Sequence, residues 1–111
     1  GLVTLKRRGG FSVTDLTALD NGDVIVLERR FRYSEGVKMR LRRIGAAAIR
    51  PGATLDGDVL FKADQLFEID NMEGLAAHID DKGRTILTVI SDNNFNSFLQ
   101  RTLVMQFAVV E

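Results

Sequence analysis

The chain has 111 residues, of which 45% are hydrophobic and 27% charged, and its 15 basic and 15 acidic residues cancel at neutral pH. This length and composition indicate one globular domain and argue against disorder. There is no cysteine, which excludes disulfides and thiolate metal sites, and no apolar run approaches the roughly 20 residues of a membrane-spanning helix.

The first half of the chain predicts a meander of short strands. A strand over residues 11–19 meets a hairpin signal, Asp-Asn-Gly-Asp, at residues 20–23, because Asn and Gly tolerate positive φ. The return strand over residues 24–31 begins with residues that are apolar on both faces, as in the interior of a sheet. Over residues 37–44 apolar and basic residues alternate, so we expect this strand to have one face in water.

The second half repeats this order after a loop-like region that carries the single proline. Residues 59–69 fit either a strand or a short helix. Two strands follow, joined by a turn at Asp81-Lys82-Gly83, and then a polar loop and a last strand that is apolar on both faces. We therefore divide the single domain, residues 1–111, into repeat one at about 11–44, a connection at 45–69 and repeat two at about 70–110.

Residues 14–31 match residues 73–95, with Leu16 corresponding to Leu75 and Glu28 to Asp92. The fold class predicted is all-β, with antiparallel meanders that form two propeller-blade-like repeats. Two blades cannot close a ring of about 4 to 8, so we expect a fragment of a larger propeller. The first residue, Gly rather than Met, agrees with a chain that was processed or cut.

The charges are segregated along the chain. Residues 29–43 hold seven basic residues and one acid, whereas residues 56–81 are mainly acidic. The basic segment has few aromatic residues and no nucleic-acid motif, so we favour a solvated strand face that pairs with acids elsewhere over a nucleic-acid partner. The last strand, residues 103–110, carries no charge that would block pairing with another chain. This predicts a homo-oligomer that forms through exposed strand edges.

The side chains best suited to chemistry flank the two strands of the second hairpin. Asp70, Asn71 and Glu73 stand before or at the start of one strand, and Asp92 and Asn93 at the end of the next. Because hairpin strands run antiparallel, Glu73 and Asp92 should lie at the same end.

These five residues supply the oxygen ligands that Ca²⁺ prefers, and a bound Ca²⁺ would neutralise a phosphoester and activate water. An acid–base pair of Glu73 and Asp92 without metal is the second interpretation. A third is that the Asp and Asn side chains bond to turn backbone. His78, the single histidine, has no second histidine nearby, which favours a structural role.

Three segments together carry a resemblance. They are NMEGLA at residues 71–76, ISDNNF at 90–95 after a glycine-containing turn, and QRT at 100–102 before an apolar strand. In this combination the chain resembles the phytase-like domain family, named for an esterase-like activity of phytase. The resemblance implies a repeated, acid-rich β domain of exported bacterial proteins, located in the periplasm or outside the cell, that is related to phosphoester and phytate chemistry.

Two function classes follow. The first is an enzyme, or a fragment of one, that acts on a small-molecule phosphoester through Glu73 and Asp92, with Ca²⁺ as the candidate metal. The alternative is a non-catalytic β-propeller module that binds a ligand or a protein across its loop face. Glu28, the counterpart of Asp92 in repeat one, would be the matching acid of the first blade.

Overall fold

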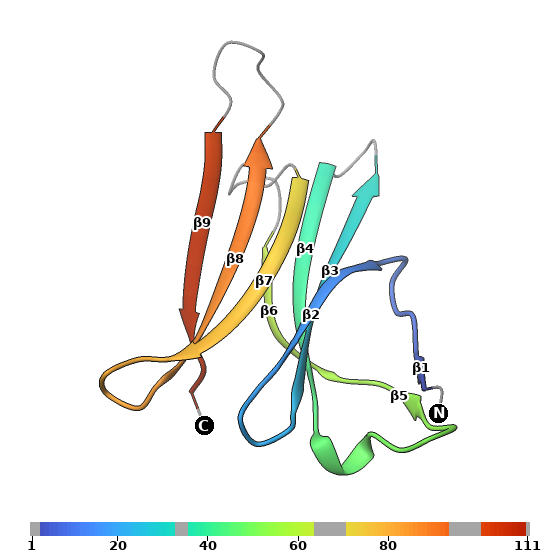
Figure 1. The fold of residues 1–111 in the computed structure, drawn as a ribbon. Coiled ribbons are helices and arrows are strands. Elements are labelled where there is room, and N and C mark those ends of the chain that lie inside the picture. Colours follow the sequence, from blue (N-terminus) through green and yellow to red (C-terminus); the bar gives the residue numbers. More distant parts are fainter. Residues whose placement is uncertain (1–2, 33–35, 64–70, 94–100, 111) are drawn as a thin grey trace.

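Short β-strands form nearly all of the regular structure in the computed structural model, which describes residues 3–32, 36–63, 71–93 and 101–110 (Figure 1). At residues 37, 63, 71–73, 91–93 and 101–103 it describes the backbone alone. The elements are β1 (Thr4–Leu5), β2 (Ser12–Ala18), β3 (Val24–Arg32), β4 (Gly36–Ile44), a 3-10 turn η1 (Ala46–Ala48), β5 (Thr54–Leu55), β6 (Asp58–Ala63), β7 (Asn71–Ile79), β8 (Thr85–Asn93) and β9 (Arg101–Ala108). The predicted all-β fold with antiparallel meanders is confirmed.

The first sheet has the strand order β2-β3-β4-β6, and each strand runs antiparallel to its neighbours. The predicted hairpin turn joins β2 to β3. Gly22 takes a φ of 90° there, a conformation that a side chain would disfavour, and the Asn21 Oδ1 accepts a hydrogen bond from the Asp23 amide at 2.9 Å. The fourth strand, β6, comes from the segment that was expected to be a connection. The first sheet therefore extends beyond the predicted end of repeat one at about residue 44.

The second sheet has the order β7-β8-β9 and is also antiparallel. Its hairpin turn contains Gly83, with a φ of 77°. The Asp80 carboxylate accepts hydrogen bonds from the backbone amides of Lys82, at 3.0 Å, and Arg84, at 2.8 Å. A turn that is held by an acidic side chain and a glycine fixes the register of the two strands on either side of it.

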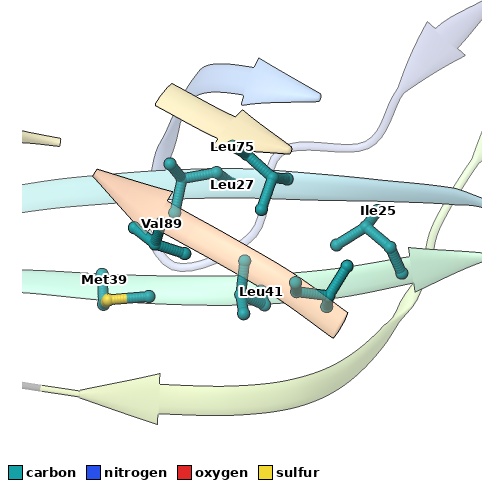
Figure 2. Close-up of a cluster of buried hydrophobic side chains, with 7 residues drawn as sticks. Ile25, Leu27, Met39, Leu41, Leu75 and Val89 are labelled. Carbon is teal, nitrogen blue, oxygen red and sulfur yellow. The ribbon is translucent and has the colours of Figure 1, made fainter. Parts of the chain in front are cut away.

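The two sheets pack face to face around one hydrophobic core (Figure 2). The first sheet contributes residues of β3 and β4 and the second sheet residues of β7 and β8, namely Ile25, Leu27, Met39, Leu41, Leu75, Leu87 and Val89. Leu27, Met39 and Val89 are completely inaccessible to solvent. Burial of each such side chain contributes about 1.5–3 kcal/mol. Because this core draws on both sheets, neither repeat has a comparable core of its own, and we expect them to fold together.

The opposite face of the first sheet is covered by the N-terminal segment, residues 3–11, together with β5. β1 pairs with β5 in parallel, and a small cluster of Val26, Ile44 and Leu55 lies beneath this layer. The Lys6 carbonyl accepts a hydrogen bond from Arg42 at 3.1 Å. The alternating strand predicted to have one face in water is therefore covered on both faces.

Two arginines of β4, Arg40 and Arg42, lie inside this second interface, which corrects the expectation of a solvated basic face. Arg40 is 4% exposed and Arg42 is 0% exposed. They do pair with acids elsewhere, as predicted. The two oxygens of the buried Glu28 contact Arg40 Nε at 2.8 Å and Arg42 Nη1 at 2.9 Å, and Arg42 also contacts Asp56 at 3.0 Å. The expectation was wrong because the covering segment lies about thirty residues away in sequence.

The path of the chain through the two sheets bears on the predicted propeller. β6, the last strand of the first sheet, precedes β7, the first strand of the second, and β2 and β7 are neighbours across the sheet interface. Successive meanders that pack face to face are compatible with two adjacent propeller blades. Within the described residues no helix is long or apolar enough to cross a membrane.

Candidate functional site

A β-bulge interrupts the second hairpin at its candidate acid. Met72 pairs with Ser91 and Gly74 pairs with Ile90, so Glu73 is the extra residue between them. Bulges turn a side chain away from the regular alternation of a strand and are frequent next to active sites. The backbone therefore marks position 73 as a special position in β7.

The first hairpin has a bulge at the equivalent place. Val13 pairs with Glu28 and Asp15 pairs with Leu27, which leaves Thr14 as the extra residue. The Thr14 hydroxyl donates a hydrogen bond to the Leu27 carbonyl at 3.4 Å. At this position the first sheet thus has a neutral side chain bonded to backbone, whereas the second sheet has an acid.

The two bulged strands are linked directly. The Asp15 Oδ2 accepts a hydrogen bond from the backbone amide of Leu75 at 2.8 Å, and its Oδ1 accepts one from the Leu16 amide at 2.8 Å. A side chain built at Gly74 would reach ordinary contact distance of the same carboxylate, 3.8 Å. The sequence analysis missed this role of Asp15. The one feature of the sequence that could have indicated it is that Asp15 stands where the aligned second repeat has Gly74.

The register places the backbones of the two candidate acids at one end of the β7–β8 hairpin. Asn71 lies directly opposite Asp92, and Glu73 follows Asn71 by two residues. Opposite residues of an antiparallel pair have Cα atoms roughly 4.5–5.5 Å apart. Asp70 lies outside the described residues, as do the side chains of Asn71, Glu73, Asp92 and Asn93.

Comparison with family models gives one result that bears on these residues. Residues 2–95 match the model described as Phytase-like, esterase-like activity of phytase. The chain belongs to this phytase-like family. The matched range contains both sheets up to the end of β8, and with it both bulges and all the candidate acids. Comparison with curated proteins and with solved structures gives no match.

In this phytase-like domain the two hairpins correspond differently from the prediction. Counted from the bulge, Leu16 pairs with Val26 and Leu75 pairs with Val89, so Glu28 is equivalent to Ser91 rather than to Asp92. The predicted equivalence is therefore one residue out. Val26 follows Leu16 by 10 residues and Val89 follows Leu75 by 14, so the second hairpin is four residues longer, whereas the alignment of Glu28 with Asp92 assumed five.

Glu28 lies in the interior of the domain. It is 1% exposed, and both of its carboxylate oxygens contact arginines. The Arg40 guanidinium lies over the Phe11 ring at 4.0 Å from the centroid, and Arg40 Nη2 donates to the Arg8 carbonyl at 3.0 Å. This network holds the N-terminal segment against the first sheet, so Glu28 has a structural role in the phytase-like domain.

Two further acids are engaged at the hairpin turns, at the other end of the strands from Glu73. Asp23 accepts a hydrogen bond from the Ala46 amide at 2.8 Å and pairs with Arg43 at 2.8 Å. The Ala46 amide, and then Arg43, lower the pKa of Asp23. The Arg84 amide, followed by the Arg84 side chain and the Lys82 amide, lowers the pKa of Asp80. Both acids therefore serve the turns.

The remaining candidate, His78, is exposed on the face of β7 that points away from the shared core. Across the residues whose side chains the structure describes, no cluster of three or more His, Asp or Glu side chains is arranged to hold a metal ion. The candidate calcium ligands lie outside that set.

Proposed function

We propose that this phytase-like domain acts on phosphoesters through the acidic end of the β7–β8 hairpin, with Asp92 and Glu73 as its central residues. The observation that carries the proposal is the register. It brings Asn71 opposite Asp92 and places Glu73 at a bulge on the same strand end. The family match supports the class of chemistry.

The donor set fits a calcium ion. Asp70, Asn71, Glu73, Asp92 and Asn93 are all carboxylate or amide side chains, which are the hard oxygen ligands that Ca²⁺ selects. A bound Ca²⁺ would supply positive charge to a phosphoester dianion and lower the pKa of a coordinated water.

The protein's own contribution is to position these groups. The ladder between β7 and β8 places the backbone of Asn71 opposite that of Asp92, and the backbone bulge at Glu73 lies two residues from this pair. Glu73 is the residue we assign to accept a proton from the attacking water, because a carboxylate in reach of a nucleophile can act as a general base. Asp92 would hold a bound Ca²⁺ or orient the same water. We also propose that the domain belongs to an exported bacterial protein, as the resemblance to the phytase-like family implies.

The test combines binding and turnover. If Ca²⁺ binds the folded state, its presence at about a hundred times the dissociation constant should stabilise the domain by about 2.7 kcal/mol, which raises Tm by roughly ten degrees for a chain of this size. A chelator should reverse the shift, and a generic phosphoester should be hydrolysed in the presence of Ca²⁺.

A domain that shows neither a calcium-dependent Tm nor phosphoester turnover would contradict this proposal and favour a binding module. If the domain hydrolyses the phosphoester equally well in the presence of a chelator, the result would support the acid–base pair of Glu73 and Asp92 and exclude a role for the metal in turnover.

A further inference from the structure

Arg29 lies on the inward face of the first sheet, at the border of the shared core. Alternate residues of a strand share a face, so Arg29 is on the same side of β3 as the core residues Ile25 and Leu27. It pairs with Met39 of β4, which is completely buried in that core. A charged side chain therefore stands directly beside an apolar cluster, between the two sheets.

The guanidinium of Arg29 has no partner in the part of the chain that the structure describes. Its Nε is buried and makes no hydrogen bond. Among the described residues Arg29 also forms no ion pair, whereas each of the three arginines of β4 pairs with an aspartate or a glutamate. A partly buried cation without an acceptor costs the fold stability. A group of this kind in a native protein indicates a catalytic role or a bound ion.

The backbone brings Arg29 to the end of the sheets at which the candidate acids stand. Asp15 pairs with Leu27 and accepts a hydrogen bond from the Leu75 amide, which links β3 to β7. Arg29 lies two residues beyond Leu27 and Glu73 two residues before Leu75, which corresponds to about 7 Å along each strand. In Figure 1 the end of β3 and the start of β7 lie at the same end of the domain. Arg29 and the bulge at Glu73 therefore flank one end of the sheet interface.

The core shows the same arrangement. Met39 and Val89 lie at the same end of the core in Figure 2. Arg29 is the neighbour of Met39, and β8 continues from Val89 to Asp92. Phe31, which follows Arg29 by two residues, is 53% exposed, and Arg29 itself is partly exposed. The guanidinium thus stands where the core meets solvent, so an anion from solution can reach it.

We propose that Arg29 binds the phosphoryl group of the phosphoester at this end of the sheets. The inference rests on the proposed function and names the residue that recognises the charge of the substrate. The planar guanidinium fork can donate two parallel hydrogen bonds to two phosphoryl oxygens. The carboxylates of Glu73 and Asp92 repel a phosphoester dianion, so the site needs a positive side chain in addition to a metal ion.

The missing partner distinguishes this role from a structural one. Arg29→Met keeps an apolar stem against the core and removes a charge that no acceptor compensates, so its Tm should equal or exceed that of the wild type. If Arg29 instead held the fold through an ion pair, the same change would leave an acid unpaired and lower the Tm. The matched control is Arg50→Met, at an exposed position in the loop that follows the far end of β4. It makes the same change in net charge away from the site.

Kinetics with a generic phosphoester at saturating Ca²⁺ tests the binding role. Arg29→Met should raise KM and the inhibition constant of inorganic phosphate, each at least about tenfold, because a charge-assisted pair of hydrogen bonds is lost. Arg29→Lys should give intermediate values, because a lysine retains the charge and lacks the fork. The Ca²⁺-dependent rise in Tm should persist in both variants, and Arg50→Met should behave like the wild type.

The outcomes separate this inference from the proposed function. If the wild type is active and Arg29→Met has the same KM and inhibition constant, the role of Arg29 is overturned and the proposed function stands. A Tm of Arg29→Met well below that of Arg50→Met overturns it as well. If the wild type has no turnover, the proposed function fails, and calorimetric titration with inorganic phosphate decides on Arg29 alone. Binding by the wild type that Arg29→Met loses then supports the anion site, and any other result overturns it.

Discussion

The Asp15 carboxylate accepts a hydrogen bond from the Leu75 amide, with 2.8 Å between N and Oδ2, and so joins the edge strands of the two sheets across sixty residues of sequence. The bond lies immediately beside both bulges. It ties the candidate acid's strand, β7, to the first sheet.

We expect Asp15→Ala to lower the free energy of unfolding by about 1–3 kcal/mol, because the Leu75 amide loses its partner in a partly buried position. Asp15→Asn retains an oxygen acceptor and should lose less. Urea denaturation would measure both. The control is Asp81→Ala, at an exposed position of the turn between β7 and β8. It should change the free energy of unfolding by no more than about 0.5 kcal/mol. An Asp15→Ala variant as stable as that control would show that the link is dispensable.

The buried ion network predicts an unusual order of stabilities. Glu28→Leu leaves Arg40 and Arg42 buried without their shared carboxylate, which should destabilise the domain by about 3–5 kcal/mol. Replacing the two arginines with Met in the same variant removes the uncompensated charges and should restore part of the loss. Chemical denaturation of the single and triple variants tests this, and a triple variant less stable than the single one would contradict it.

The site predicts that Glu73 and Asp92 act as a unit. Asp92→Asn should weaken Ca²⁺ binding or phosphoester turnover strongly while it preserves the fold, because the amide keeps the shape and removes the charge. Glu73→Gln should behave in the same way, and the double variant should be no worse than the poorer single variant. Calorimetric Ca²⁺ titration and initial rates would be compared for all four proteins. Additive losses, or no loss at Asp92, would argue that these acids are turn residues.

The aspartates at the two hairpin turns, Asp23 and Asp80, predict that the domain loses stability at low pH. The pKa values of Asp23 and Asp80 are lowered below 3.8 in the folded state, so each contributes stability that is present above that value and is lost as the pH falls through the folded pKa. Asp23→Asn should therefore be less stable than the wild type at about pH 6, and the difference should shrink below about pH 3.5. Urea unfolding over a pH series measures the difference, and a pH-independent difference would assign it to another cause.

Local sequence determined the strands and the tight turns of this protein. Gly22 and Gly83 take the positive φ that their hairpin turns require, and the paired strands on either side follow from their hydrophobic pattern. The same local information placed Glu73 and Asp92 at one end of a hairpin, because antiparallel pairing fixes which residues face each other. These features depend on neighbours in sequence, and the sequence was sufficient for them.

Tertiary structure alone decided what covers each face and where the alternation breaks. Arg40 and Arg42 read as solvated residues, yet the N-terminal segment buries them against Glu28. The strand registers placed bulges at Thr14 and Glu73 and made Ser91, rather than Asp92, the counterpart of Glu28. A periodic pattern specifies two faces of a strand but not their partners, because the free energy of covering a face depends on segments that are distant in sequence and near only in the folded chain.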